Sequence, residues 1–246
     1  MAETGDWRNL AGFLEGLRGA RRGVKGWQME KMVRRACGGG RLGVVNDCLR
    51  RVQKTGMGLW DLRVSREVMW GALGKCGLEG WSREGVERAT RFADNVWELM
   101  ADPRHSWRMA GVTDPKRRPE ILGILVLLHA CRVALFGEGK DEVAAVERHT
   151  QSMLKFWDSQ ELDFAEGDWN DANYKLLMWA PVWRGMTVAQ KVLGPSSPLG
   201  KELERKLCEE LGPLMERGQA VLSANLPAGG TRRGLKVQTE LSQLSV

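Results

Sequence analysis

Arginine and lysine occur in clusters at several places in this sequence. The 246 residues include 37 Lys and Arg against 31 Asp and Glu, a formal charge of +6. Arginine binds phosphate through paired hydrogen bonds and stacks on unpaired bases, and neutralising phosphates releases counterions. Five basic clusters are therefore predicted to contact RNA. Their members are Arg18, Arg21, Arg22, Lys25, Arg34, Arg35, Arg50, Arg51, Lys54, Lys116, Arg117, Arg118, Arg232, Arg233 and Lys236.

The charge is distributed unevenly along the chain. Residues 1–60 hold 12 basic and 5 acidic side chains, or +7, whereas residues 138–180 hold 4 and 10, or −6. This separation predicts a basic surface for RNA and an acidic surface that faces a protein neighbour or solvent. Two alternatives to RNA contact stay open for the basic clusters. Charge runs commonly form the solvated faces of helices, and a GC-rich gene would also enrich arginine.

Motifs for catalysis or metal binding are missing from the sequence. The glycine run Gly38–Arg41 lacks the Gly-Lys-Ser/Thr ending of a phosphate loop. His129 and Cys131 are two residues apart in a helical pattern, so they point in different directions. The five cysteines include no C-x-x-C pair, which favours a reducing compartment. We expect no catalytic residue, no metal and no cofactor.

The basic clusters lie in segments that have a helical period. Apolar residues recur at i, i+3, i+4 and i+7 from the first stripe at residues 10–17 onward, while Ile, Tyr and Thr are scarce. The sequence therefore predicts an all-α fold. Residues 27–56, 65–101 and 119–158 each have the pattern helix, short turn with glycine, helix. Stacked antiparallel hairpins would form a short α-solenoid, and a single irregular helical bundle is the alternative.

Several residues predict where helices begin and end. Ser65 and Ser82 each precede a glutamate two residues later and are predicted N-caps. Pro119 suits the first helical position, and Asp168 is placed to cap the helix that follows it. Gly137 follows the last periodic residue of its helix, where a left-handed C-cap favours glycine.

Composition divides the chain into three predicted parts. A helical-repeat domain covers residues 1–193, a Pro/Ser/Gly break and a C-terminal helix cover 194–224, and an extended basic tail covers 225–246. The most apolar run, Ile121–Phe136, is short for a membrane span and contains His129 and Arg132. We predict that it is a buried core helix and that the chain has no membrane span.

Tryptophan is unusually common, with 11 residues against one tyrosine. Most lie at predicted helix ends or on apolar stripes, so packing between hairpins is the expected role. One or two could instead present a flat ring to a base or a protein neighbour.

One segment resembles a degenerate pentatricopeptide or tetratricopeptide hairpin. Residues 34–42 end a helix in a glycine turn, and residues 48–57 finish a second helix in a basic stretch followed by Thr-Gly-Met. Residues 87–89 and 95–100 resemble the second helix of another hairpin. The style is similar to helical-repeat proteins of fungal mitochondria, including mitochondrial ribosomal proteins. The sequence has no intact consensus repeat, so base-reading positions are not transferred.

The resemblance implies a non-enzymatic structural component of a mitochondrial ribonucleoprotein, and in particular a mitochondrial ribosomal protein of the matrix. Its partners would be rRNA, through the basic surfaces, and neighbouring proteins of a large complex. The alternative is a helical-repeat adaptor, or an assembly or translation factor, that contacts protein alone. Steep salt dependence of RNA binding would distinguish the first from the second.

Overall fold

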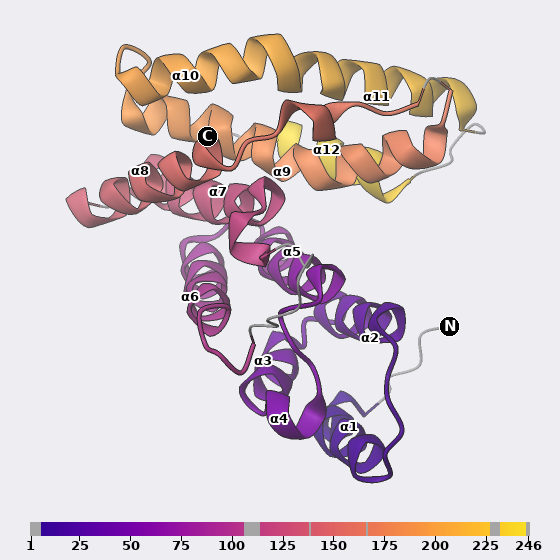
Figure 1. Ribbon diagram of the computed structural model, residues 1–246. Coiled ribbons are helices and arrows are strands. Elements are labelled where there is room, and N and C mark those ends of the chain that lie inside the picture. The colour runs from indigo at the N-terminus through magenta and orange to yellow at the C-terminus, as the bar shows by residue number, and fades with distance from the viewer. Residues whose placement is uncertain (1–5, 106–113, 138, 166, 227–231, 245–246) are drawn as a thin grey trace. The chain divides into compact units, whose positions relative to one another are not determined.

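A computed structural model describes residues 6–105, 114–137, 139–165, 167–226 and 232–244. All regular elements in these residues are helical, which confirms the predicted all-α class (Figure 1). The chain forms two compact units, Met1–Arg117 and Arg118–Val246. This division lies well before residue 193, where the predicted helical-repeat domain ends.

Unit 1 consists of six α-helices and two short 3-10 turns in its described residues. The α-helices pair in sequence as α2 with α3 and α5 with α6, and each pair is joined by a turn with glycine. These pairs match the predicted helical segments 27–56 and 65–101. The elements are η1 (Trp7–Asn9), α1 (Leu10–Gly19), α2 (Gly26–Gly38), α3 (Leu42–Arg50), α4 (Val52–Thr55), α5 (Leu62–Leu78), α6 (Arg83–Leu99) and η2 (Pro115–Arg117).

The core of unit 1 lies where α2 and α6 pack against α5. Val33, Val68 and Val96 are fully buried there, and burying each such side chain contributes roughly 1.5–3 kcal/mol. Ser82 caps α6 as predicted, because its Oγ accepts a hydrogen bond from the Gly85 N–H at 3.2 Å. The predicted cap at Ser65 is wrong. This serine is buried inside α5 and its hydroxyl donates to the Leu59 carbonyl.

Asp61 is the residue that caps α5. Its carboxylate accepts a hydrogen bond from the Arg63 N–H at 3.0 Å, so the helix begins one turn before the predicted start. Both Asp61 and Ser65 are good N-cap types. Val64 is apolar and buried, so it extends the core-facing stripe back toward Asp61. Burial of Val64 therefore favours a helix that begins directly after Asp61.

Unit 2 is built around two long helices, α7 and α9. Their partners are α8, which packs against α7, and α10, α11 and α12, which pack against α9. The helix pair α7–α8 matches the predicted segment 119–158. The elements are α7 (Pro119–Phe136), α8 (Lys140–Lys155), η3 (Ser159–Leu162), α9 (Trp169–Leu193), α10 (Pro198–Lys206), η4 (Leu207–Leu211), α11 (Gly212–Asn225) and α12 (Arg233–Ser242).

Helix α7 is the predicted buried core helix. It begins at Pro119 and ends at Phe136, and the next residue, Gly137, has a φ of 66° and is the predicted left-handed C-cap. Its length and composition alone would allow it to cross a membrane, but 72% of the apolar window is buried inside the protein. Near its end, Glu142 of α8 pairs with His129 Nδ1 at 2.7 Å and with Arg132 at 2.6 Å. These contacts give both polar side chains that interrupt the apolar run a carboxylate partner.

Glycines allow α7 and α9 to approach closely. A Cβ atom added at Gly123 of α7 would lie 2.8 Å from the Val182 Cα, and one at Gly185 of α9 would lie 2.8 Å from the Gly123 carbonyl oxygen. Both distances are shorter than any normal contact, so only glycine fits at these two positions. The same α9 helix is capped as predicted by Asp168, whose carboxylate accepts from the N–H groups of Asn170 and Asp171.

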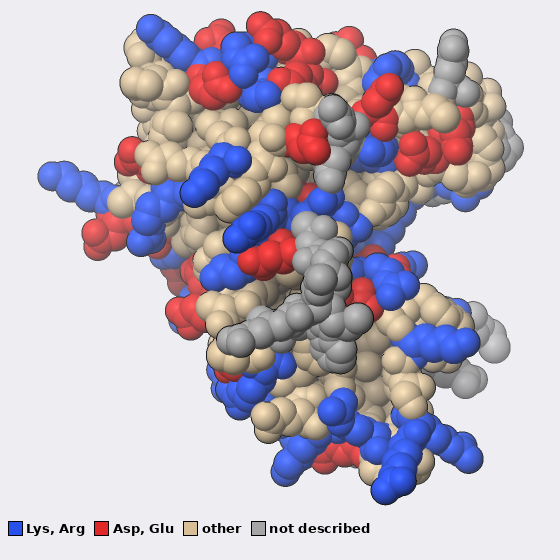
Figure 2. Space-filling model, viewed as in Figure 1, with Lys and Arg blue, Asp and Glu red and all other residues tan. Residues whose placement is uncertain are grey.

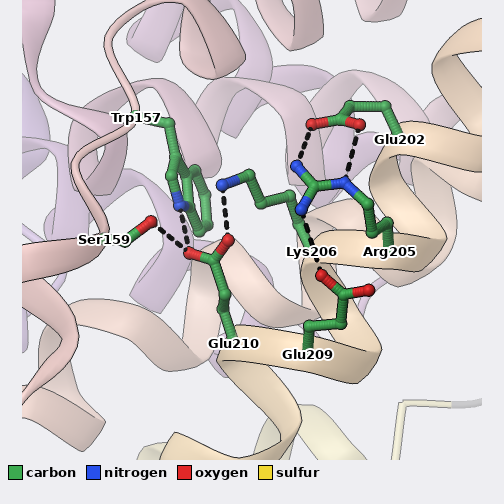
Figure 3. A network of polar contacts seen from close by, with 7 residues as sticks. All are labelled: Trp157, Ser159, Glu202, Arg205, Lys206, Glu209 and Glu210. Carbon is green, nitrogen blue, oxygen red and sulfur yellow. Dashed lines mark hydrogen bonds and ion pairs between the residues drawn. The ribbon is translucent and has the colours of Figure 1, made fainter.

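A π-helical segment, η4, joins α10 to α11. Pro213 follows it and lacks an N–H, so the regular hydrogen-bond pattern cannot continue across this point, and π-bulges commonly form at such interruptions. Figure 3 shows the polar network at this bulge. Glu210 accepts hydrogen bonds from Trp157 Nε1 and Ser159 Oγ, both at 2.7 Å, and pairs with Lys206 at 2.5 Å. The segment after α8 is thereby fixed to η4.

The C-terminal residues differ from the prediction. The expected extended tail is wrong for Arg233–Ser242, which form α12 and pack along α9. Gly234 permits the close approach, because a Cβ atom there would lie 2.2 Å from the Asn173 carbonyl oxygen. The Gly234 N–H donates to Asn173 Oδ1 at 2.9 Å, and the buried Arg184 guanidinium donates to the Leu244 carbonyl.

We predict that Gly234→Ala releases α12 from α9. The added methyl group would overlap the backbone of α9, and the docked helix would lose the Asn173 hydrogen bond. Limited proteolysis should cleave the variant near residue 233 at least tenfold faster than the unchanged chain. The control is Gly139→Ala, where an added Cβ meets no atom within 4 Å. Equal cleavage rates in both variants would contradict the role given to Gly234.

Candidate nucleic-acid interface

The first basic surface lies where the C-terminal ends of α1 and α4 meet, beside α3. Arg18, Arg50 and Lys54 occupy the last turns of α1, α3 and α4. The Arg18 guanidinium lies against Gly56, the C-cap of α4. Figure 2 shows Lys and Arg side chains around these helices, with few acidic side chains among them. A cation at a helix C-terminus also interacts favourably with the negative end of the helix dipole, so these side chains stabilise the fold as well.

Arg21 lies at a backbone position that normally selects glycine. The Arg22 N–H donates to the Leu17 carbonyl and the Arg21 N–H to the Arg18 carbonyl, each at 2.9 Å, which closes α1 with a Schellman motif. Arg21 has a φ of 56° at the left-handed position of this motif. The equivalent position after α2 is Gly40, with a φ of 72°. A left-handed arginine costs roughly 1 kcal/mol relative to glycine.

Several predicted residues have their charge neutralised by neighbours. Arg51 pairs with Glu15 at 2.5 Å and with Asp47 at 3.2 Å. Arg34 pairs with Glu30 and, at 3.1 Å, with the buried Glu67. These two arginines therefore link helices within unit 1, and their charges are less available to an RNA phosphate than their place in the sequence suggests.

Other predicted residues keep an exposed charge. Arg50 shares a long hydrogen bond of 3.4 Å with Asn95 and is otherwise exposed. Six further side chains are exposed and make no ion pair with any residue that the structure describes. These six are Arg18, Arg21, Arg22, Lys25, Arg35 and Lys54. We call Arg18, Arg21, Arg22 and Lys54, at the joined ends of α1 and α4, the basic end of unit 1.

The cluster at residues 116–118 has mainly structural contacts. Lys116 lies over the Trp97 ring, 4.4 Å from its centroid, and Arg117 is 3.8 Å from Asp114. Arg118 pairs with Glu120 at 3.0 Å and is only partly exposed. Cation–π contacts and ion pairs of this kind organise the chain around η2, which reduces the charge that this cluster presents to a partner.

The C-terminal basic residues lie at and within α12. Arg232 stacks on Trp169, with 4.0 Å from its guanidinium carbon to the ring centroid. Lys236 is 3.7 Å from Glu240 on the next turn, and both are exposed. Arg233, in the first turn of α12, is partly buried. The predicted basic residues therefore form separate groups within the two units.

Sequence reasoning missed Lys31 and Arg41, because neither has a basic neighbour in sequence. Both are exposed in unit 1 and make no ion pair with a residue in the described ranges. Helical spacing was the signal that could have identified Lys31, since it lies four residues before Arg35 on α2.

Two buried cysteines, a buried histidine and the acidic segment within residues 138–180 have structural surroundings. Burial raises the pKa of the Cys48 and Cys131 thiols to about 12, so both stay protonated and weakly reactive at neutral pH. Burial lowers the pKa of His105, and its Nδ1 accepts a hydrogen bond from the Leu59 N–H at 3.3 Å. The acidic segment is likewise used locally, since Asp163 pairs with Arg217 at 3.1 Å and Asp168 caps α9.

Comparison with known proteins identifies the family. Residues 1–241 match the family described as mitochondrial ribosomal protein mS27. The chain belongs to the mS27 family. The small ribosomal subunit protein mS27 of Neurospora crassa is 29% identical over 106 residues, which are 43% of this chain and 27% of that protein. The aligned part thus spans about a quarter of the length of the curated relative.

Membership of the mS27 family confirms the predicted class of protein, a structural, non-enzymatic ribosomal protein of the mitochondrion. The resemblance to fungal mitochondrial ribosomal proteins is also confirmed by the Neurospora relative. The predicted pentatricopeptide or tetratricopeptide character and the stacked solenoid stay predictions. So does the assignment of individual basic residues to RNA.

Proposed function

We propose that this chain is a structural component of the mitochondrial small ribosomal subunit in the matrix, and that the basic end of unit 1 binds rRNA phosphates. The match to mS27 over residues 1–241 supports the assignment to the ribosome. Four exposed cations at the joined ends of α1 and α4, without ion pairs to described residues, support the RNA contact. A polyanion such as RNA binds preferentially to a surface that carries positive charges without carboxylate partners.

The observation that carries the RNA contact is the backbone of Arg21. Glycine at this position would relieve the left-handed strain, as Gly40 does after α2. An arginine there adds a positive charge to the basic end and lowers the stability of the fold. Strained backbone of this kind is commonly found at functional positions. The remaining surfaces, including the stacked hairpins expected of a helical-repeat protein, would face protein neighbours.

Sedimentation of the tagged chain in a mitochondrial lysate tests the proposal. We expect the chain to migrate with the small subunit at low salt. Raising the salt should release it, because each phosphate contact adds to the salt dependence of binding. Migration only at the top of the gradient would contradict the ribosomal assignment. Migration with the small subunit at every salt concentration would instead favour the alternative, attachment through protein alone.

A further inference from the structure

Trp27 is the most exposed tryptophan in the described part of the chain. Its side chain, in the first turn of α2, is 52% exposed. It makes no hydrogen bond and no ring contact with the residues that the structure describes. Other tryptophans have partners: Trp157 packs edge-on against Trp179, and Arg232 lies over Trp169. The expected role in packing between helices therefore fails for Trp27.

Two cations follow Trp27 at helical spacing. Lys31 and Arg35 stand four and eight residues further along α2, so the three side chains lie along one side of the helix. Both cations are exposed and form no ion pair with the described residues. The opposite side of α2 is apolar and packs against α5, with Met29 and Val33 buried. The face of Trp27, Lys31 and Arg35 is called the α2 outer face below.

Nearby carboxylates do not neutralise this face. Asp61, beside the start of α2, accepts hydrogen bonds from Nε and Nη2 of the Arg63 guanidinium, both at 3.0 Å. Glu30 and Glu67 are paired with Arg34. Each of these three acidic groups thus has an arginine partner, and Lys31 and Arg35 add two further positive charges to the face.

We propose that the α2 outer face binds an unpaired stretch of RNA, with one base stacked on the Trp27 ring and adjacent phosphates on Lys31 and Arg35. An exposed aromatic ring beside uncompensated cations is the combination that single-stranded nucleic acid requires, since the base stacks while the backbone is neutralised. A duplex keeps its bases stacked internally and offers no free face to the ring. This inference rests on the proposed RNA contact and specifies the form of RNA at a second surface of unit 1.

The test measures binding of the full chain to oligouridine and to an RNA hairpin of equal length. Trp27→Ala should weaken oligouridine binding about tenfold, within the range measured for losing one base–aromatic stack. Hairpin binding and the salt slope should stay unchanged, because no charge is removed. Trp27→Phe should recover part of the lost affinity. Lys31→Gln should instead lower the salt slope by about 0.7 on a single strand.

Leu78→Ala is the matched control, because Leu78 is an apolar side chain of the same unit with 65% exposure. It should leave oligouridine affinity unchanged. The stacking proposal would be overturned if Trp27→Ala and the unchanged chain bound oligouridine with equal affinity. It would also be overturned if Trp27→Ala lost equal affinity for oligouridine and for the hairpin. Either result would leave the phosphate contact intact. If the Trp27→Ala variant no longer associated with small subunits but kept its full RNA affinity, the α2 outer face would be assigned to a protein neighbour. That result would also overturn the stacking proposal. Failure of the unchanged chain to bind any RNA would instead refute the proposed function itself.

Discussion

Reversing three charges at the basic end of unit 1 is expected to lower RNA affinity about a hundredfold at moderate salt. In the variant Arg18→Glu, Arg21→Glu and Lys54→Glu, exposed cations without ion pairs to described residues become repulsive to phosphate. The slope of log affinity against log salt should fall by about two to three, because up to three phosphate contacts are lost. Filter binding or fluorescence anisotropy across a salt series measures both quantities.

A matched triple variant separates local from general charge effects. Arg91, Arg148 and Lys201 are exposed and make no ion pair with residues in the described ranges. Reversing these three gives the same net charge and should lower affinity much less. Equal losses in the two triple variants would show that net charge, rather than the basic end, determines RNA binding.

Arg21→Gly distinguishes lost contact from lost folding. Glycine removes the left-handed strain and should raise the free energy of unfolding by roughly 1 kcal/mol, while removing one phosphate contact. A variant that is more stable and binds RNA more weakly cannot owe its weaker binding to unfolding. An unchanged RNA affinity would refute the role assigned to the Arg21 charge.

Gly123→Ala is expected to destabilise unit 2 by about 2 kcal/mol or more. The added methyl group would lie 2.7 Å from Val182 Cγ2 and 2.8 Å from its Cα, so α7 and α9 would have to separate. In thermal unfolding followed by circular dichroism, the transition of unit 2 should shift down by about 5 °C or more. Because α7 and α9 form the centre of this unit, the α8 and α12 contacts should loosen as well.

Gly74→Ala provides the control for that substitution. Gly74 also lies inside a helix, α5, but a Cβ there would meet no atom within 4 Å. Alanine is the better helix former, so this variant should gain roughly 0.5–1 kcal/mol. If Gly123→Ala raises stability as Gly74→Ala does, helix propensity outweighs the α7–α9 contact and the role given to Gly123 is wrong.

Local signals predicted the ends of several helices, and their outcomes show where such signals suffice. Ser82, Pro119, Gly137 and Asp168 function as expected because a cap depends on one or two backbone groups next to it in sequence. Ser65 failed because an equally good cap, Asp61, lies one turn earlier. Packing against the core determined that Asp61, and not Ser65, caps the helix.

The basic clusters could be found from the sequence, but their roles could not. A cluster in sequence shows only that charges are close along the chain. Pairing with a distant carboxylate, as between Arg51 and Glu15 or Arg34 and Glu67, depends on helix packing. For the same reason the exposed ring of Trp27 was indistinguishable from the buried rings, since both kinds occupy helical positions.

The order of residues was enough to establish the all-α class, the helix pairs, the buried α7 and the uneven charge, because periodicity, capping and charge act over a few residues. Helix packing settled which cations remain uncompensated, which tryptophan faces outward, and that residues 233–242 dock as α12 instead of extending. These features depend on contacts between helices far apart in sequence, such as the approach of Gly234 to Asn173, which no local pattern encodes.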